Sequence, residues 1–267
     1  MSTRTKGEKA LLTVLLVFLL RYPVAWALNG LIPDAWGSTA VYVRVILRET
    51  ITYLLPGMAV VRRRKQFSRK MQWYHVPAAL AAGVMAQYAL SALTEAWTGW
   101  TGLSSSGVML MPSTVAEWIP AVLALVLLPA AAEEVFFRGL LQGTLQEEHS
   151  PVTALLLSTA SFALMHGSPA GLPAHLGCGL LLGVLYAGGG NLNLCILFHA
   201  AYNGAAVVWS YYPVQMSLPW VILCAGALLL SAGCLLRTAK KQGHGLTWTE
   251  GALAGLLLTM EVLPYFF

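Results

Sequence analysis

Long apolar runs separated by short polar segments dominate the sequence. A helix that crosses the hydrocarbon of a membrane needs about 20 mostly apolar residues, and most of these runs reach or approach that length. The pattern predicts about eight spans, roughly at 10–28, 41–61, 73–93, 118–145, 152–167, 172–190, 192–210 and 215–236. We therefore expect an all-α fold, a polytopic transmembrane helix bundle of about eight spans.

Two apolar segments fit this pattern less well. Arg44, Arg48 and Glu49 interrupt the run 41–61, which fits a surface-lying helix leading into a shorter span as well as a full span. The tail segment 251–265 is short and contains Glu261 and a proline, so a ninth span and a peripheral helix are both open for it.

The N-terminal run also resembles a signal peptide, because basic residues precede it and Ala25 to Ala27 resemble a cleavage site. We favour an uncleaved first span, since many further hydrophobic runs follow it.

Composition supports a membrane protein. The chain is 57% hydrophobic and 10% charged, whereas an ordinary soluble domain is roughly 25% charged. Its net charge of +5 does not indicate nucleic-acid binding, because the basic residues lie beside apolar runs. The four cysteines lie inside apolar runs without a CxxC pair and are predicted to be core residues. The expected partner on these grounds is membrane lipid, with no nucleic acid.

Basic clusters predict the topology. They occur before the first run, between the second and third, and after the eighth: Arg4, Lys6 and Lys9; Arg62 to Lys70; Arg237, Lys240 and Lys241. Alternating spans place all three clusters on one side, which the positive-inside rule assigns to the cytoplasm. We expect a multi-pass protein of the cell membrane with a cytoplasmic N-terminus.

A few ionisable or polar groups lie inside apolar runs, where they usually face a cavity or one another. They are Glu133, Glu134, Arg138, His166, His199 and Asn203. Glu134 and Arg138 are four residues apart, so they share a helix face and can pair. Glu133 is rotated by about 100° from Glu134 and should be free of that pair.

Depth estimates allow these groups to meet. At 1.5 Å per residue, Glu133 lies about 18 Å and His166 about 21 Å from the cytoplasmic end of their spans, with Asn203 at about 17 Å and His199 at about 10 Å. Small residues would let the helices pack closely around a shared chamber: Gly177, Gly179, Gly183, Ala200, Ala201, Gly204 and Ala205. A free carboxylate with an imidazole can deprotonate water, and a second imidazole with an amide can stabilise an oxyanion. His175 is predicted to be an interfacial or packing residue, and a place at the substrate entrance stays open for it.

These motifs resemble those of the CPBP intramembrane proteases, which include the type II CAAX prenyl endopeptidases. The family pattern EExxxR, FxxxH and HxxxN occurs here as Glu133-Glu134-VFF-Arg138, Phe162-ALM-His166 and His199-AAY-Asn203, within about residues 118–208. The resemblance implies that Glu133 and His166 activate water, that His199 and Asn203 polarise the scissile carbonyl, and that Glu134 and Arg138 order the site.

By the convention of this family, the resemblance favours a metalloprotease, with the metal itself unproven. Glu133, His166 and His199 would then hold a divalent metal such as zinc. The sequence has no HExxH motif, so the usual spacing of zinc proteases is missing.

We thus divide the chain into an N-terminal transmembrane region (1–117), a protease core (118–208) and a C-terminal region (209–267). The expected function is intramembrane hydrolysis of a peptide bond by water that Glu and His activate, and the expected partner is a peptide or membrane-protein substrate. A non-catalytic scaffold or self-immunity protein of the same fold is the alternative. A proton-coupled transporter is less favoured, because the chain shows no internal repeat.

Overall fold

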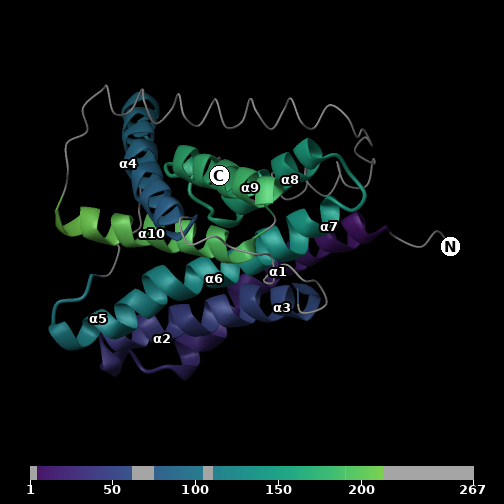
Figure 1. Cartoon of the computed structure of the whole chain (residues 1–267). Helices are drawn as coiled ribbons and strands as arrows, with labels where there is room; N and C mark the ends of the chain where they lie inside the picture. Colours follow the sequence, from purple (N-terminus) through teal and green to yellow (C-terminus); the bar gives the residue numbers. More distant parts are fainter. Residues whose placement is uncertain (1–4, 62–74, 105–110, 190, 213–267) are drawn as a thin grey trace.

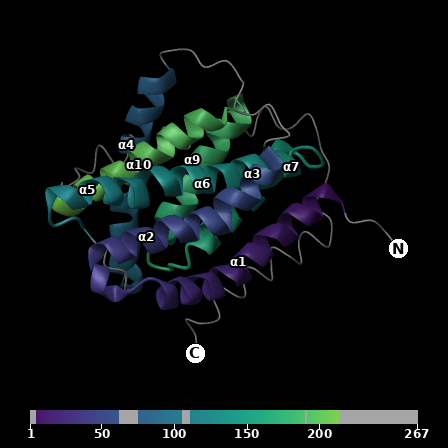
Figure 2. The same ribbon diagram turned by 90° about the horizontal axis from the view of Figure 1, so that it is seen from below.

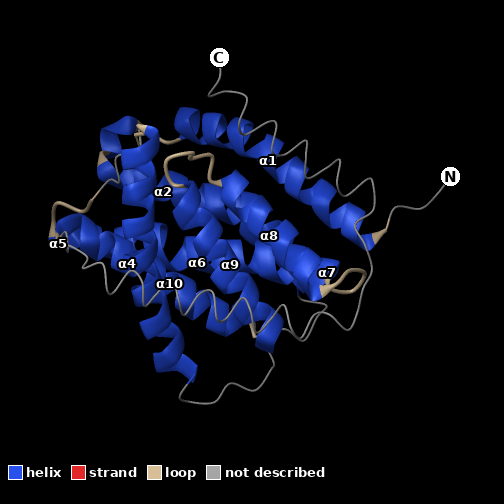
Figure 3. Cartoon of the chain, turned by 90° about the horizontal axis from the view of Figure 1, so that it is seen from above, coloured by secondary structure: helices blue, strands red, loops and turns tan. Residues whose placement is uncertain are grey.

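All regular secondary structure in the described residues is helical. A computed structural model describes residues 5–61, 75–104, 111–189 and 191–212, and Figure 3 shows helices and loops only within these ranges. The expected all-α membrane bundle is confirmed.

Several of the helices join into longer ones through π-helical segments (η2, η3 and η4). In chain order the elements are α1 (Lys6–Leu31), η1 (Asp34–Trp36), α2 (Ser38–Glu49), η2 (Thr50–Leu54), α3 (Leu55–Val61), α4 (His75–Thr101), α5 (Val115–Val122), η3 (Leu123–Leu127), α6 (Leu128–Glu134), η4 (Val135–Gln142), α7 (Gly143–Leu145), α8 (Pro151–Met165), α9 (Leu172–Gly189) and α10 (Leu192–Tyr211). One helix therefore runs from Ser38 to Val61 and another, which we call the central helix, from Val115 to Leu145.

The central helix lies between the α2–α3 helix on one side and α10 on the other, as Figures 1 and 2 show from two directions. Helix α1 lies outside α2–α3, and α4 packs across α10. Helix α8 packs on η4, and α9 fills the space between α8 and α4. The carboxyl half of the central helix is thus enclosed by other helices.

Local sequence signals explain where the helices begin and end. Thr5 and Glu8 form a reciprocal capping box that starts α1. Ser150 caps α8 with its side chain, and Pro151 occupies the first turn, where its missing N–H costs nothing. Gly167, at φ 56°, then ends α8, because a residue without Cβ adopts this left-handed conformation without strain. His166 is consequently held at the last turn of α8.

Four helices of the described chain are long and apolar enough to cross a membrane: α1, α4, the central helix and α10. This is fewer than the eight spans predicted. The structure has shorter apolar helices in the regions 152–167 and 172–190. The sequence predicted spans there because hydropathy alone does not distinguish a helix buried in protein from one facing lipid. The region 41–61 is helical but carries charges, and 215–236 and the tail 251–265 lie outside the described residues.

Small residues bring the helices together as expected. Gly177 faces Leu90 and Gly183 faces Leu155, in each case without room for a Cβ. Gly83 of α4 lies against the backbone carbonyl of Phe198 in α10. Such contacts let helix backbones approach closely, which narrows the bundle around the polar groups.

Candidate active site

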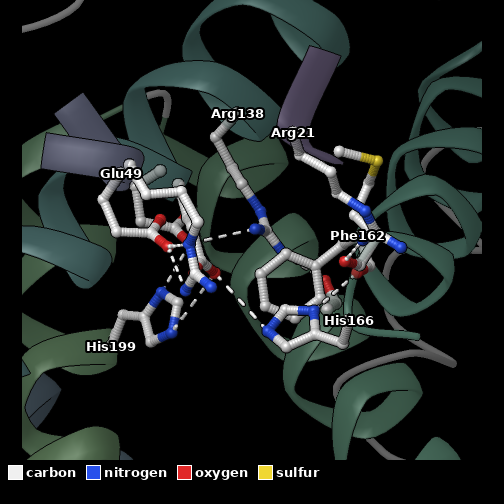
Figure 4. Close-up of polar contacts among 11 residues, drawn as sticks. Arg21, Glu49, Arg138, Phe162, His166 and His199 are labelled. Carbon is white, nitrogen blue, oxygen red and sulfur yellow. Dashed lines mark hydrogen bonds and ion pairs between the residues drawn. The ribbon is translucent and has the colours of Figure 1, made fainter. Parts of the chain in front are cut away.

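The three sequence motifs converge inside the bundle. Glu133 and Glu134 end α6, Arg138 lies in η4, His166 follows α8 and His199 lies in α10. Figure 4 shows Arg138, His166 and His199 reaching toward one another from these different elements. The carboxylates and Arg138 thus flank the start of a π-helical segment, a feature that is frequent at functional sites.

Glu134 lies at the centre of a buried polar network. Its Oε1 accepts hydrogen bonds from Arg138 Nη1 and from His199 Nδ1, both at 2.9 Å. The Glu134 and Arg138 side chains are fully buried. Arg138 also donates through Nη2 to the carbonyl of Gly179 at 2.9 Å, and its guanidinium lies 4.7 Å from the Phe162 ring centroid. We call Glu134, Arg138, His199 and the Gly179 carbonyl the paired network. The Glu134–Arg138 pair expected from spacing is present in it.

Glu133 has very different surroundings. Its Oε2 is buried and has no hydrogen-bond partner among the described residues. The nearest basic atoms are His166 Nε2 at 3.7 Å and His199 Nε2 at 4.0 Å. Two imidazoles from two helices therefore face one free carboxylate oxygen.

Hydrogen bonds at the other ring nitrogen define the tautomers of both histidines. His166 Nδ1 lies 2.8 Å from the carbonyl of Phe162, which can only accept, so Nδ1 carries the hydrogen. His199 Nδ1 likewise donates to Glu134. In the neutral forms both Nε2 atoms therefore present lone pairs to Glu133. His199 can donate from Nε2 only in its doubly protonated form, in which Nδ1 still donates to Glu134.

Two further residues lie beside this group. Asn203 is half-buried one turn beyond His199, and no hydrogen bond links it to Glu133, His166 or His199 in the part of the chain described. His175 stacks on His166, with ring centroids 4.1 Å apart and planes inclined by 25°. His175 thus packs as predicted, but against a candidate catalytic side chain.

A cavity of about 480 Å³ adjoins Glu133 and His166. Its other walls come from helices outside the motifs and include Arg21, Arg48 and Glu49. Sequence reasoning treated Glu49 as an interruption of a span and did not single out Arg21. The position of Glu49 inside an apolar run could have indicated this role, since a charge in such a run usually faces a cavity or a partner.

The metal hypothesis has a chemically suitable donor set in Glu133, His166 and His199, because both histidines hold Nε2 toward the carboxylate. However, no group of three His, Cys, Asp or Glu side chains within the described ranges is arranged to hold a metal ion. The metal therefore stays a prediction, and no step below passes through one.

Comparison with known proteins supports the resemblance found in the motifs. Residues 115–205 match the family model described as type II CAAX prenyl endopeptidase Rce1-like. The match covers about a third of the chain and includes every motif residue from Glu133 to Asn203. This segment is thus similar to the type II CAAX prenyl endopeptidases that the family model describes. A search of the curated proteins finds no match for the chain.

Proposed function

We propose that the protein is an intramembrane endopeptidase of the cell membrane that hydrolyses a peptide bond in a membrane-associated protein or peptide. The observation that carries this proposal is the free Glu133 Oε2, buried beside a cavity and faced by two imidazole Nε2 atoms. The matched protease domain contains all three side chains. A cytoplasmic N-terminus, from the basic clusters, belongs to the same proposal.

Glu133 and His166 supply the first step. The 3.7 Å between Glu133 Oε2 and His166 Nε2 lets one water donate a hydrogen bond to each. The water oxygen then attacks the scissile carbonyl carbon, a C–O bond forms, and the water proton passes to Glu133. No side-chain nucleophile is required.

His199 and Asn203 act in the second step, in which the tetrahedral intermediate is stabilised and breaks down. Protonated His199, supported by Glu134 through Nδ1, donates from Nε2 to the oxyanion of the tetrahedral intermediate. The Asn203 amide would be the second donor. When the C–N bond breaks, Glu133 returns its proton to the leaving amine, so that the carboxylate is regenerated.

The test is cleavage of membrane-associated peptides by the purified chain in lipid vesicles. We expect Glu133→Ala and His199→Ala to lower the rate by about 10²- to 10⁴-fold while the helical fold is retained. Glu95→Ala, which changes an exposed acid of α4, is the matched control and should cleave normally. Unchanged cleavage by Glu133→Ala would rule out the mechanism. A cellular role without cleavage of any peptide would instead favour the scaffold or self-immunity alternative.

Dialysis against a chelator separates two roles for Glu133. Retained activity supports Glu133 as the base that acts directly on water. Loss of activity that zinc restores would make Glu133, His166 and His199 metal ligands.

A further inference from the structure

The cavity beside Glu133 has walls from two parts of the chain. Glu133, His166 and Gly167 come from the matched domain, while Arg48 and Glu49 come from the α2–α3 helix, outside it. Whatever occupies the cavity therefore contacts residues that the family motifs do not include.

Glu49 is the buried acid of that second wall. Only 4% of it is exposed. Its Oε1 accepts hydrogen bonds from Arg48 Nε at 3.2 Å and Arg48 Nη2 at 2.9 Å. Its Oε2 is buried and has no hydrogen-bond partner among the described residues. Glu49 also lies close enough to His166 and His199 for an electrostatic interaction, and Figure 4 draws these three labelled side chains in one group of polar residues.

A buried carboxylate oxygen without a donor is costly. Glu49 would not need to line the cavity if it served only to neutralise Arg48, whose side chain is 45% exposed. Arg48 holds one oxygen of Glu49 in place and leaves the other available. Two residues that line the cavity, Glu49 and Glu133, thus each have one buried carboxylate oxygen without a hydrogen-bond partner among the described residues. In the mechanism above, Glu133 Oε2 accepts from the water.

We infer that Glu49 is a substrate-contacting residue, whose free oxygen accepts a hydrogen bond from the N–H of the scissile peptide bond and then binds the amine that hydrolysis releases. This inference rests on the proposed function. A carboxylate suits both stages, because it accepts from a neutral N–H and attracts the ammonium group formed from the product amine. In this arrangement Glu133 acts on the water, and Glu49 binds the nitrogen of the scissile peptide bond.

This role predicts a substrate class. The favoured peptide bond carries an N–H, whereas a bond to proline or to an N-methylated residue cannot make the contact. Hydrogen bonds to charged groups have net values that correspond to about 10- to 100-fold in an equilibrium or rate. We therefore expect kcat/KM for the N–H peptide to exceed that for its N-methyl analogue by about 10-fold or more.

The experiment measures kcat/KM of the full-length protein in vesicles for one cleaved peptide and for the same peptide N-methylated at the scissile bond. Glu49→Gln should lower kcat/KM for the N–H peptide by about 10- to 100-fold and reduce the preference for N–H over N-methyl. Glu49→Asp keeps the charge with a shorter reach and should give intermediate values for both.

Arg48→Met separates this role from a structural one, because it removes the partner of Oε1 and keeps the free carboxylate. It should alter the preference less than Glu49→Gln does. The inference is overturned if Glu49→Gln keeps the wild-type rate and preference, or if it and Arg48→Met lower the rate equally with the preference unchanged. Failure of the wild-type protein to cleave any peptide would instead overturn the proposed function and this inference with it.

Discussion

Glu133 and Glu134 are adjacent in the chain, but their carboxylates lie in two regions that differ in hydrogen bonding. In the paired network, one oxygen of Glu134 accepts from a guanidinium and an imidazole. Beside the cavity, Glu133 has imidazole nitrogens near Oε2, but this oxygen has no hydrogen bond from any residue that the structure describes. A helical rotation of about 100° between neighbouring residues produces this separation.

The difference shows how a bundle can hold a reactive group among apolar helices. Glu134 and Arg138 balance each other's charge and hold His199 in one orientation, while Glu133 keeps one oxygen without a hydrogen-bond partner in the described chain. Even the paired network is incomplete within the chain described, since Glu134 Oε2 and Arg138 Nε also have no hydrogen-bond partner. The two regions therefore differ in whether the carboxylate has a cation beside it, and not in whether every polar atom has a hydrogen bond.

The largest predicted effect tests the free carboxylate. Glu133→Gln keeps the side-chain shape and removes the base, so peptide cleavage should fall by about 10²- to 10⁴-fold. The thermal unfolding midpoint should stay close to that of the wild type, because no hydrogen bond to Oε2 is lost. Cleavage assays and thermal unfolding on the same preparation measure both. A large drop in the midpoint would show that Glu133 belongs to the paired network after all.

The second effect tests the paired network. Arg138→Met leaves the buried Glu134 carboxylate without its cation, and breaking a buried pair from one side costs about 3–5 kcal/mol. We expect this loss in the free energy of unfolding, measured by denaturant titration in mild detergent. Arg138→Lys, which retains the charge but not the planar guanidinium, should recover part of it. Wild-type stability in Arg138→Met would contradict the proposed distinction between the regions.

A smaller effect concerns the ring that holds His166 beside Glu133. His175→Ala removes a stacking contact of the kind that contributes about 0.5–1.5 kcal/mol, so cleavage should fall by about 2- to 10-fold. His175→Phe restores a ring at the same place and should recover most of the activity, with any loss appearing in kcat rather than KM. Equal rates for His175→Ala and the wild type would show that Phe162 alone orients His166.

The smallest predicted effect concerns a carboxylate that caps the start of α1, away from the cavity. Glu148, in the turn after α7, accepts hydrogen bonds from the backbone N–H groups of Lys6 and Gly7 at 2.8 Å each. Partial burial raises the pKa of Glu148, but these hydrogen bonds outweigh it, so that the net pKa is lowered. The resulting stabilisation is present above the ordinary carboxyl pKa and is lost as the pH falls through the lowered folded value.

Glu148→Gln should therefore flatten the dependence of the thermal midpoint on pH below about pH 5. We expect a change of less than about 1 kcal/mol, the usual contribution of a carboxylate at a helix N-terminus near the surface. Glu8 of the capping box provides a control acid at the same end of α1. An unchanged acid dependence in Glu148→Gln would assign the effect to other carboxylates.

Much of this arrangement could be predicted from neighbouring residues. Helical periodicity placed Arg138 on the same face as Glu134 and rotated Glu133 away from it. The apolar runs predicted helices at 10–28, 73–93 and 192–210, which lie within or overlap α1, α4 and α10. These features depend on contacts within one helix, whose geometry is nearly constant.

Other features were decided only by the tertiary structure. The sequence did not reveal that His199 donates from Nδ1 to Glu134, or that Glu49 shares a cavity with Glu133. Nor did it separate the four long apolar helices from the shorter ones inside the bundle. The physical reason is that helix periodicity orders residues a few positions apart, whereas the partner of a side chain 65 or more positions away depends on how the helices pack.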